Sequence, residues 1–222
     1  MKLFAVIPAY NEATEIAAVI ERTRPHVERV IVVNDGSTDG TADAARAAGA
    51  DVYSHVINRG LGASLGTGFE AARRLDADAV VTLDADGQHD PAEISKFREA
   101  LGKGADFVIG SRLIAPTGGM PWYRVVANWL GNMVTFVLFG AWVTDSQSGF
   151  RGLSKKALAT MVVRANRMEV SSELVAEARH RRLVFAEVPI KAIYTEYSLS
   201  KGQSFFVGIK MLAKLVFRRL TH

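Results

Sequence analysis

Three oxygen-bearing side chains stand at every second position directly after an apolar run. Residues 79–83 (AVVTL) form the run, and Asp84, Asp86 and Gln88 follow it. Carboxylate and amide oxygens are the hard ligands that Mg²⁺ and Mn²⁺ prefer. An acidic turn that starts a helix is the alternative, because the Asp-Pro pair at 90–91 is a good helix entry. The position at the end of a buried strand favours a cation site over the turn.

Short apolar runs alternate with helical patterns through the first half of the chain. We expect strands at residues 3–7, 30–33, near 52, 79–83 and 107–110, and helices at 15–24, 41–48, 63–75 and after Pro91. Runs of β-branched residues with helices between them are typical of a parallel sheet covered on both faces. Because crossovers in such a sheet are right-handed, the loops after successive strands gather at one edge, where ligands bind. The polar motifs PAYNE, NDGSTDGT, NRGLG and DADGQ all follow strands, so we expect them to converge there.

The composition is that of a globular α/β protein. The chain has 222 residues, of which 49% are hydrophobic and 23% charged, and it has no cysteine. The absence of cysteine excludes disulfides, thiolate metal sites and a cysteine nucleophile. The N-terminal segment turns polar too soon for a signal peptide, so we expect a cytoplasmic protein. The net charge of +4 is modest, and we expect no nucleic-acid partner.

The first two loops carry groups that suit a nucleoside. Pro8 fixes the exit from the first strand, Tyr10 offers a flat ring with a hydroxyl, and Glu12 offers a carboxylate. Asp35 either contacts ribose hydroxyls or a base edge, or forms a turn with its own backbone. Neither G-x-G-x-x-G after the first strand nor G-x-x-x-x-G-K-[ST] is present, and RGLGASLGTG follows the third strand. This placement excludes the usual dinucleotide and ATP sites.

Five motifs in order, IPAYNE, VVNDGSTDGT, NRGLGAS, LDADGQHDP and GSR, resemble those of the family 2 glycosyltransferases. Within that family they are most similar to the dolichyl- or polyprenyl-phosphate mannose and glucose synthases. The resemblance covers roughly residues 3–115 and continues more loosely through DSQSGFRG and EVPI to SK. It implies a type-A glycosyltransferase fold, a mostly parallel Rossmann-like sheet with helices on both faces, which binds a nucleotide-sugar together with Mg²⁺ or Mn²⁺.

The resemblance also implies roles for individual residues. The nucleoside contacts are Pro8, Tyr10, Glu12, Val33 and Asp35, the diphosphate contacts are Asp84, Ala85 and Asp86, and the metal ligands are Asp84, Asp86 and Gln88. The contacts to the acceptor phosphate are Arg112, Arg124, Ser200 and Lys201. Residues 195–201 (TEYSLSK) keep the Ser-Lys end of the family's R-x-x-G-x-S-K pattern but lack its Arg and Gly. Lys201, with Arg124, is therefore expected to replace that arginine.

The implied reaction depends on cations more than on a base. The metal offsets the charge that builds on the departing diphosphate, and a polyprenyl phosphate is already an anion. The arginines and the lysine assigned above bring these two anions together. We expect Asp86 and Arg112 to act in catalysis, with Asp145 as a third candidate that lies either near the sugar or in a structural turn. His89, within the metal loop, either adds a ligand or faces solvent.

A long uncharged stretch opens the second half of the chain. Residues 125–143 hold no charge, but Asn128, Asn132 and Thr135 recur on one helical face. We therefore expect an amphipathic element beside the active-site mouth, where a lipid tail can lie, rather than a membrane span. Further on, a serine at 171–172 is expected to cap a helix.

The C-terminal segment is a second amphipathic pattern. Lys210, Lys214 and Arg218 form a basic stripe on an apolar helix, which suits a membrane interface. A helix packed on the core or against a second subunit is the alternative. The expected organisation is a nucleotide-sugar-binding half at 1–115, an acceptor-binding half at 116–200 and an amphipathic C-terminal helix at 201–222.

The expected function is metal-dependent, inverting transfer of one hexose from GDP-mannose or UDP-glucose to a polyprenyl phosphate, dolichyl or undecaprenyl. Inversion is implied by the family, which displaces in a single step. We expect peripheral association with the cytoplasmic face of the membrane, while a membrane-protein partner and a homo-oligomer both stay open. One alternative is a soluble or polysaccharide acceptor, although a processive synthase usually carries Q-x-x-R-W, which is absent. The other is a non-catalytic scaffold that binds metal and nucleotide.

Overall fold

The computed structural model of the chain describes residues 1–114, 128–133, 136–137, 140, 142–167, 169–191 and 193. Three predicted phosphate contacts, Arg124, Ser200 and Lys201, and the predicted helix at 201–222 lie outside these residues. The division into a donor half, an acceptor half and a C-terminal helix therefore stays a prediction.

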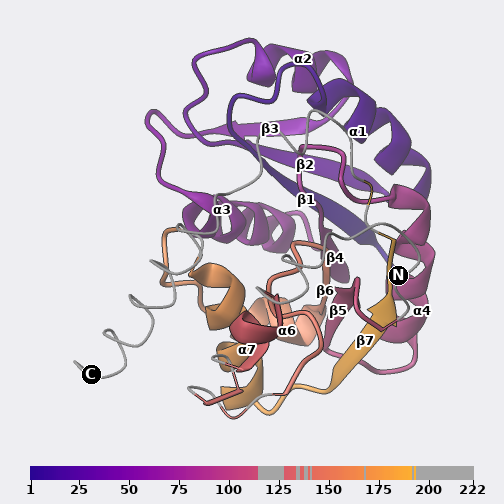
Figure 1. Cartoon of the computed structure of the whole chain (residues 1–222). Helices are drawn as coiled ribbons and strands as arrows, with labels where there is room; N and C mark the ends of the chain where they lie inside the picture. The colour runs from indigo at the N-terminus through magenta and orange to yellow at the C-terminus, as the bar shows by residue number, and fades with distance from the viewer. Residues whose placement is uncertain are drawn as a thin grey trace.

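A seven-stranded sheet forms the centre of the described part, in the order β3-β2-β1-β4-β6-β5-β7 (Figure 1). The strands are β1 (Leu3–Ala9), β2 (Arg29–Asn34), β3 (Asp51–Ser54), β4 (Ala79–Thr82), β5 (Phe107–Ser111), β6 (Arg151–Ser154) and β7 (Phe185–Pro189). All neighbours pair in parallel except β6, which runs antiparallel to both β4 and β5. The predicted mostly parallel sheet is confirmed, with one antiparallel strand that the sequence pattern did not indicate.

Helices cover both faces of the sheet, as predicted. They are α1 (Ile16–Thr23), η1 (Arg24–His26), α2 (Thr41–Ala47), α3 (Leu61–Arg74), η2 (Pro91–Glu93), α4 (Ile94–Gly102), α6 (Lys155–Thr160) and α7 (Val170–His180). Residues 128–133 are also helical. Within the described ranges, no helix is long and apolar enough to cross a bilayer.

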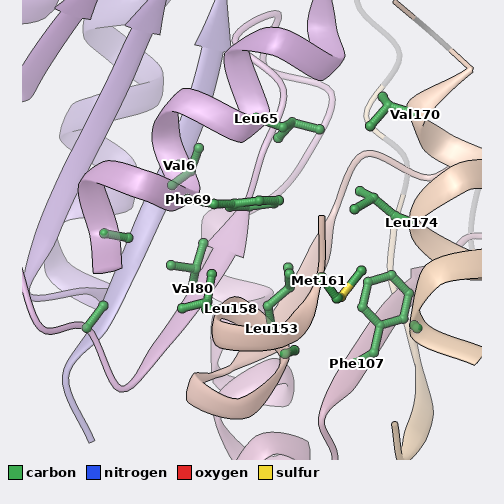
Figure 2. Packing of buried hydrophobic residues seen from close by; sticks show 14 of the residues in the cluster. Val6, Leu65, Phe69, Val80, Phe107, Leu153, Leu158, Met161, Val170 and Leu174 are labelled. Carbon is green, nitrogen blue, oxygen red and sulfur yellow. The ribbon is translucent and has the colours of Figure 1, made fainter. Parts of the chain in front are cut away.

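Alternation along the strands divides the core into two layers. In β1, Phe4 and Val6 belong to the layer beneath α3, α6 and α7. Leu3, Ala5 and Ile7 belong to the layer beneath α1, α2 and α4. Figure 2 shows the first layer, in which α3 lies over β1 and β2, and Val170 and Leu174 of α7 face the same layer near Phe107 of β5. Burial on both faces explains why these strands read as continuous apolar runs.

One helix start agrees with the expectation and one differs from it. The helix after Pro91 begins with η2, and Asp90 Oδ1 accepts a hydrogen bond from Ala92 N–H at 3.1 Å, so Asp90 does cap this turn. In contrast, α7 begins at Val170, which corrects the prediction that a serine at 171–172 caps it. The chain already turns before that point, because Val170 N–H donates to Arg167 O at 3.2 Å.

Candidate active site

One edge of the sheet collects the polar loops. Because β1, β2 and β4 are parallel neighbours, the loops after them leave the sheet at the same edge. The first residue of β6, Arg151, pairs with Thr82 at the end of β4. Residues 145–150, which lead into β6, therefore lie at this edge as well. The predicted convergence is confirmed for the described loops, and the antiparallel strand adds the DSQSGF segment to them.

Asp84 and Asp86 occupy the loop directly after β4. Solvent reaches 41% of the Asp84 side chain, so its carboxylate is open to a ligand. Asp86 Oδ1 accepts the main-chain N–H of Gln88 at 3.0 Å, and Asp86 Oδ2 accepts a hydrogen bond from the Gln88 side-chain amide. Gln88 thus holds Asp86 through its nitrogen atoms, which leaves its amide oxygen as the group that could face a cation.

The electrostatics of this pair suit a divalent cation. Burial raises the pKa of Asp84, the positive charges of Arg112 and Arg151 oppose this, and the negative charge of Glu12 adds to it. Burial and the neighbouring Asp84 charge likewise raise the pKa of Asp86. Two carboxylates that disfavour each other's ionisation are stabilised by a shared cation. In the described part of the chain, no cluster of three or more acidic, histidine or cysteine side chains is grouped to hold a metal ion. A cation on Asp84 and Asp86 would therefore need further oxygens, from Gln88, water or a bound ligand.

His89 is buried next to Asp84 and accepts a hydrogen bond from its main chain. Its ring is 5% exposed and lies 5.0 Å from the ring of Phe150, which excludes the expectation that it faces solvent. Its Nδ1 atom accepts the main-chain N–H of Asp84 at 3.2 Å, while Nε2 lies 3.7 Å from Asp84 Oδ2. Burial, opposed by the Asp86 charge, lowers the pKa of His89 to about 4. The ring is therefore neutral at pH 7, with its proton on Nε2.

Arg112 and Asp145 form a buried ion pair beside the two aspartates. Arg112 donates to Asp145 from Nε at 2.7 Å, from Nη2 at 2.8 Å and from its main-chain N–H at 3.1 Å. The Asp145 side chain is 0% exposed, whereas that of Arg112 is 19% exposed. Of the two alternatives for Asp145, the geometry favours the structural one, because its carboxylate lies behind Arg112 and both of its oxygens are engaged by it.

Side chains from distant elements fix the segment around Asp145. Asn132 accepts Ser146 N–H on its Oδ1 at 2.8 Å and donates from Nδ2 to the carbonyl of Thr144. Glu187 of β7 accepts both the main-chain N–H of Thr144 at 2.8 Å and its hydroxyl at 2.7 Å. Both neighbours of Asp145 are therefore held, and no local sequence pattern indicated that Glu187 has this role.

The predicted nucleoside contacts lie on β1, β2 and the loops that follow them. Pro8 and Val33 are register partners across these strands, and the Val33 side chain is fully buried in the layer beneath α3. Tyr10 is 45% exposed. Glu12 donates its main-chain N–H to Thr41 Oγ1 at 2.8 Å, and its charge acts on Asp84 as described above.

Asp35 ties the second loop to the third. Its Oδ1 accepts Arg59 N–H at 2.9 Å and its Oδ2 accepts Gly60 N–H at 2.7 Å, while His55 Nδ1 lies 2.7 Å from Oδ1. Burial would raise the pKa of Asp35, but the hydrogen bonds from Arg59, His55 and Gly60 outweigh it and lower the pKa below its ordinary value. Of the two alternatives for Asp35, the turn with its own backbone is not formed; Asn34 makes such a turn instead, because its Oδ1 accepts Ser37 N–H at 3.2 Å.

The glycines of NRGLG allow a close contact with the second half of the chain. Gly62 N–H donates to Asn166 O at 2.9 Å. A Cβ atom at Gly62 would lie 1.7 Å from Ala165 O, and one at Gly60 would lie 2.4 Å from Asn166 O. These glycines therefore serve close packing of the backbone, and the N-terminus of α3 receives a carbonyl from the chain itself.

The arrangement matches one large enzyme family. The model of the family described as Glycosyl transferase family 2 matches residues 4–161. The chain belongs to the family 2 glycosyltransferases. It is therefore an enzyme of sugar transfer, and the expectation of a non-catalytic scaffold is set aside.

Two relatives in this family match nearly the whole chain. The UDP-N-acetylglucosamine–dolichyl-phosphate N-acetylglucosaminyltransferase of Methanococcus voltae is 35% identical, over 98% of this chain and 96% of its own. The undecaprenyl-phosphate mannosyltransferase of Micrococcus luteus is 32% identical, over 94% of this chain and 90% of its own. This glycosyltransferase thus has full-length relatives named for transfer to lipid phosphates.

A solved structure confirms the type-A fold. Glucosyl-3-phosphoglycerate synthase from Mycobacterium tuberculosis, in complex with Mn²⁺, UDP-glucose and phosphoglyceric acid, superposes with a TM-score of 0.74. It is 23% identical, and the match covers 97% of this chain and 77% of that one. At this identity the likeness establishes the architecture alone.

Proposed function

We propose that this glycosyltransferase moves one hexose, with inversion, from a nucleotide-sugar to a polyprenyl phosphate at a membrane surface, in a reaction that needs Mg²⁺ or Mn²⁺. The observation that carries the proposal is the juxtaposition of the Asp84–Asp86 pair with the Arg112–Asp145 pair at one sheet edge. Such a site can hold a metal-bound diphosphate beside a second anion. The names of the two full-length relatives support a lipid phosphate as that anion.

On the donor side, Asp84 and Asp86 would hold the cation, with the Gln88 amide oxygen as a further ligand. When bound, the cation neutralises the charge that develops on the departing diphosphate. Of the predicted nucleoside contacts, Pro8, Tyr10, Glu12 and Asp35 would orient the base and ribose from the ends of β1 and β2 and the loops after them, whereas Val33, buried beneath α3, could offer only its main chain. His89 keeps the main chain of Asp84 in place through its hydrogen bond at 3.2 Å, so the carboxylate is positioned before the donor arrives.

On the acceptor side, the attacking group is a phosphate oxygen that is already ionised, so no side chain has to remove a proton. A bond forms from this oxygen to the anomeric carbon as the bond to the diphosphate breaks, and the nucleoside diphosphate leaves. Attack from the opposite face inverts the anomeric centre. Arg112, oriented by Asp145, would reduce the repulsion between the two anions. Arg124, Ser200 and Lys201 remain the further contacts that we propose for the acceptor phosphate.

The segment around the helix at 128–133 supports a membrane location. Its polar residue Asn132 turns inward and is 6% exposed, whereas Trp129 is 54% exposed. Nearby, Val137 and Trp142 are 73% and 63% exposed, and the rings of Phe136 and Trp142 meet edge to face at 5.4 Å. A segment that turns amide groups inward and aromatic rings outward suits a lipid interface better than water.

The proposal is tested by incubating the purified protein with vesicles that contain undecaprenyl phosphate, Mn²⁺ and a radiolabelled donor. GDP-mannose, UDP-glucose and UDP-N-acetylglucosamine are tried in turn, and labelled glycosyl lipid is extracted and identified by mass spectrometry. We expect product from one donor, loss of product with EDTA, and loss of product in Asp86→Asn. Asp43→Asn is the matched control, because the Asp43 side chain is 90% exposed on α2. Transfer only to a soluble phosphorylated acceptor such as 3-phosphoglycerate would contradict the lipid acceptor.

A further inference from the structure

Arg151 is the largest fully buried side chain of the described residues. It is the first residue of β6 and is only 2% exposed. Its Nη2 atom donates to Ser146 O at 2.9 Å and to Ser171 O, in the first turn of α7, at 3.1 Å. In the described part of the chain, none of its hydrogen bonds goes to a carboxylate, and its Nε atom has no hydrogen-bond partner.

Such an arginine costs stability. A buried charge that is not paired, and a buried N–H that donates to nothing, are both unfavourable and uncommon in folded proteins. Burial lowers the pKa of Arg151 to about 10, opposed by the negative charges of Asp84 and Asp145. The guanidinium is therefore charged at neutral pH. An apolar side chain of similar length would fill this space without the desolvation penalty of the guanidinium. The positive charge of Arg151 is therefore expected to have a function.

A short chain of contacts links Arg151 to the candidate cation site. Its main-chain N–H donates to Thr82 Oγ1 at 3.2 Å, and Thr82 Oγ1 in turn donates to Gly149 O. A Cβ atom at Gly149 would lie 2.5 Å from both carboxylate oxygens of Asp84. Arg151 thus anchors the segment that packs on Asp84, and its charge acts on Asp84 without occupying either of the oxygens that a cation would use.

We propose that Arg151 is a positioning residue whose fixed positive charge, buried beside the segment that packs on Asp84, makes divalent-cation binding depend on the diphosphate of the donor. This inference rests on the proposed function of the site. Without nucleotide, an arriving cation finds the carboxylates of Asp84 and Asp86 and the repulsion of the Arg151 guanidinium, while the charge of Arg112 is balanced by Asp145. With nucleotide, the diphosphate adds negative charge and oxygen ligands, so the cation and the donor bind together. The cation site is thereby kept weak until the donor is present.

The test measures Mn²⁺ affinity directly, from the signal of free Mn²⁺ in electron paramagnetic resonance, with and without GDP or UDP. In the wild type we expect the Kd for Mn²⁺ to fall at least about tenfold when the right nucleotide is added, which corresponds to about 1.4 kcal/mol. In Arg151→Met we expect tighter binding of Mn²⁺ alone, by about tenfold, and a smaller effect of nucleotide. Arg151→Lys keeps the charge and should behave as the wild type. Arg98→Met is the matched control, because Arg98 also donates to two carbonyls, Met1 O and His26 O, away from this edge.

Each other outcome has one meaning. Unchanged or weaker Mn²⁺ binding in a folded Arg151→Met protein overturns the role of the charge. Arg151→Gln, which removes the charge but keeps a donor for Ser146 O or Ser171 O, repeats the test if the methionine variant does not fold. If the wild-type Kd for Mn²⁺ is the same with and without nucleotide, the inference about Arg151 is overturned. The assignment of the cation site to Asp84 and Asp86 is unaffected by this result. Absence of Mn²⁺ binding to the wild type under all conditions overturns the proposed function, as does binding that survives Asp86→Asn.

Discussion

The α-carbon of Gly149 lies against the carboxylate of Asp84, so closely that a methyl group at position 149 would stand 2.5 Å from each carboxylate oxygen. The two residues come from opposite halves of the chain and meet because β6 runs antiparallel beside β4. Gly149 therefore closes one side of Asp84, while solvent reaches 41% of the Asp84 side chain from elsewhere. This contact makes the DSQSGF segment a wall of the candidate cation site.

Gly149→Ala should displace Asp84 without unfolding the protein. The added methyl group meets the end of a side chain that can rotate away, and such a shift of a metal-binding carboxylate should lower metal-dependent transfer by about 100-fold. Gly102→Ala is the matched control, since a Cβ atom at Gly102 meets nothing within 4 Å. Transfer rate and circular dichroism of both variants check this, and a fully active Gly149→Ala protein would contradict the assignment of Asp84.

Nucleotide binding should be visible as metal-dependent thermal stabilisation. A nucleotide at 100 times its Kd raises the free energy of unfolding by about 2.7 kcal/mol. We expect this shift with either GDP or UDP in the presence of Mn²⁺, and its loss in Asp86→Ala. Asp43→Ala should keep it. A panel of melting curves thus identifies the base, and an equal shift in Asp86→Ala would mean that the cation does not bridge this aspartate to the diphosphate.

The sheet edge at which the loops after β1, β2 and β4 meet could be predicted from the sequence, because the patterns that indicate it are local. Each of β1, β2 and β4 is a short apolar run buried on both faces, and each is followed at once by polar residues. Parallel topology then brings Glu12, Asp35 and Asp84 to one edge, whatever the detailed packing. The position of Asp84 and Asp86 directly after β4 could therefore be predicted from the local sequence alone.

The remainder of the site depends on contacts that have no local signature. Strand β6 reads RGLS, a sequence without strand alternation, and it pairs because β4 and β5 leave backbone groups that must be satisfied. The burial of Arg151 and His89, and the bonds from Glu187 to Thr144, follow from that pairing and from distant elements. The motif NRGLG is expected at this edge with the other polar loops, but its close backbone contact with residues 165 and 166 has no signal in the sequence.

Gly62→Ala should destabilise the fold. Its methyl group would lie 1.7 Å from the main-chain oxygen of Ala165, which cannot rotate away as a side chain can. We expect a loss of about 3 kcal/mol in the free energy of unfolding, measured in urea. Gly66→Ala, also on α3, would place its methyl group 3.9 Å from Val163 Cβ. It should instead gain about 0.5–1 kcal/mol, so equal behaviour of the two variants would rule out the close contact.

His89→Asn should make the free energy of unfolding fall less steeply as the pH drops from 6.5 toward 4. The pKa of His89 is lowered from 6.5 to about 4 in the folded protein, so between these values the unfolded chain binds a proton that the folded one does not. Wild-type stability therefore falls as pH drops from 6.5 toward 4, by an amount on the order of 3 kcal/mol. Asparagine keeps an acceptor for Asp84 N–H but does not titrate.

The raised pKa values of Asp84 and Asp86 act in the opposite direction over the acid range, because those groups bind protons more readily in the folded protein. They are present in both proteins, so the difference between wild type and His89→Asn reports the histidine together with its effect on Asp86. His180→Asn, at an exposed position at the end of α7, should keep the wild-type pH dependence. Denaturant titrations at a series of pH values measure all three, and identical slopes would show that His89 has the same pKa in the folded and unfolded protein.

A double-mutant cycle of Asp145 and Arg112 tests whether Asp145 affects sugar transfer only by orienting Arg112. Asp145→Asn should cost about 1.5–3 kcal/mol of stability, because it weakens the charge-assisted hydrogen bonds that Arg112 donates from Nε and Nη2. If Asp145 acts only by orienting Arg112, Asp145→Asn lowers transfer in the wild-type background but lowers it no further in Arg112→Gln. A further loss in the double variant would mean that Asp145 contacts the sugar itself. Asp106→Asn breaks a second ion pair, to Lys156 at 2.7 Å, and should reduce stability while leaving the transfer rate of the folded enzyme unchanged.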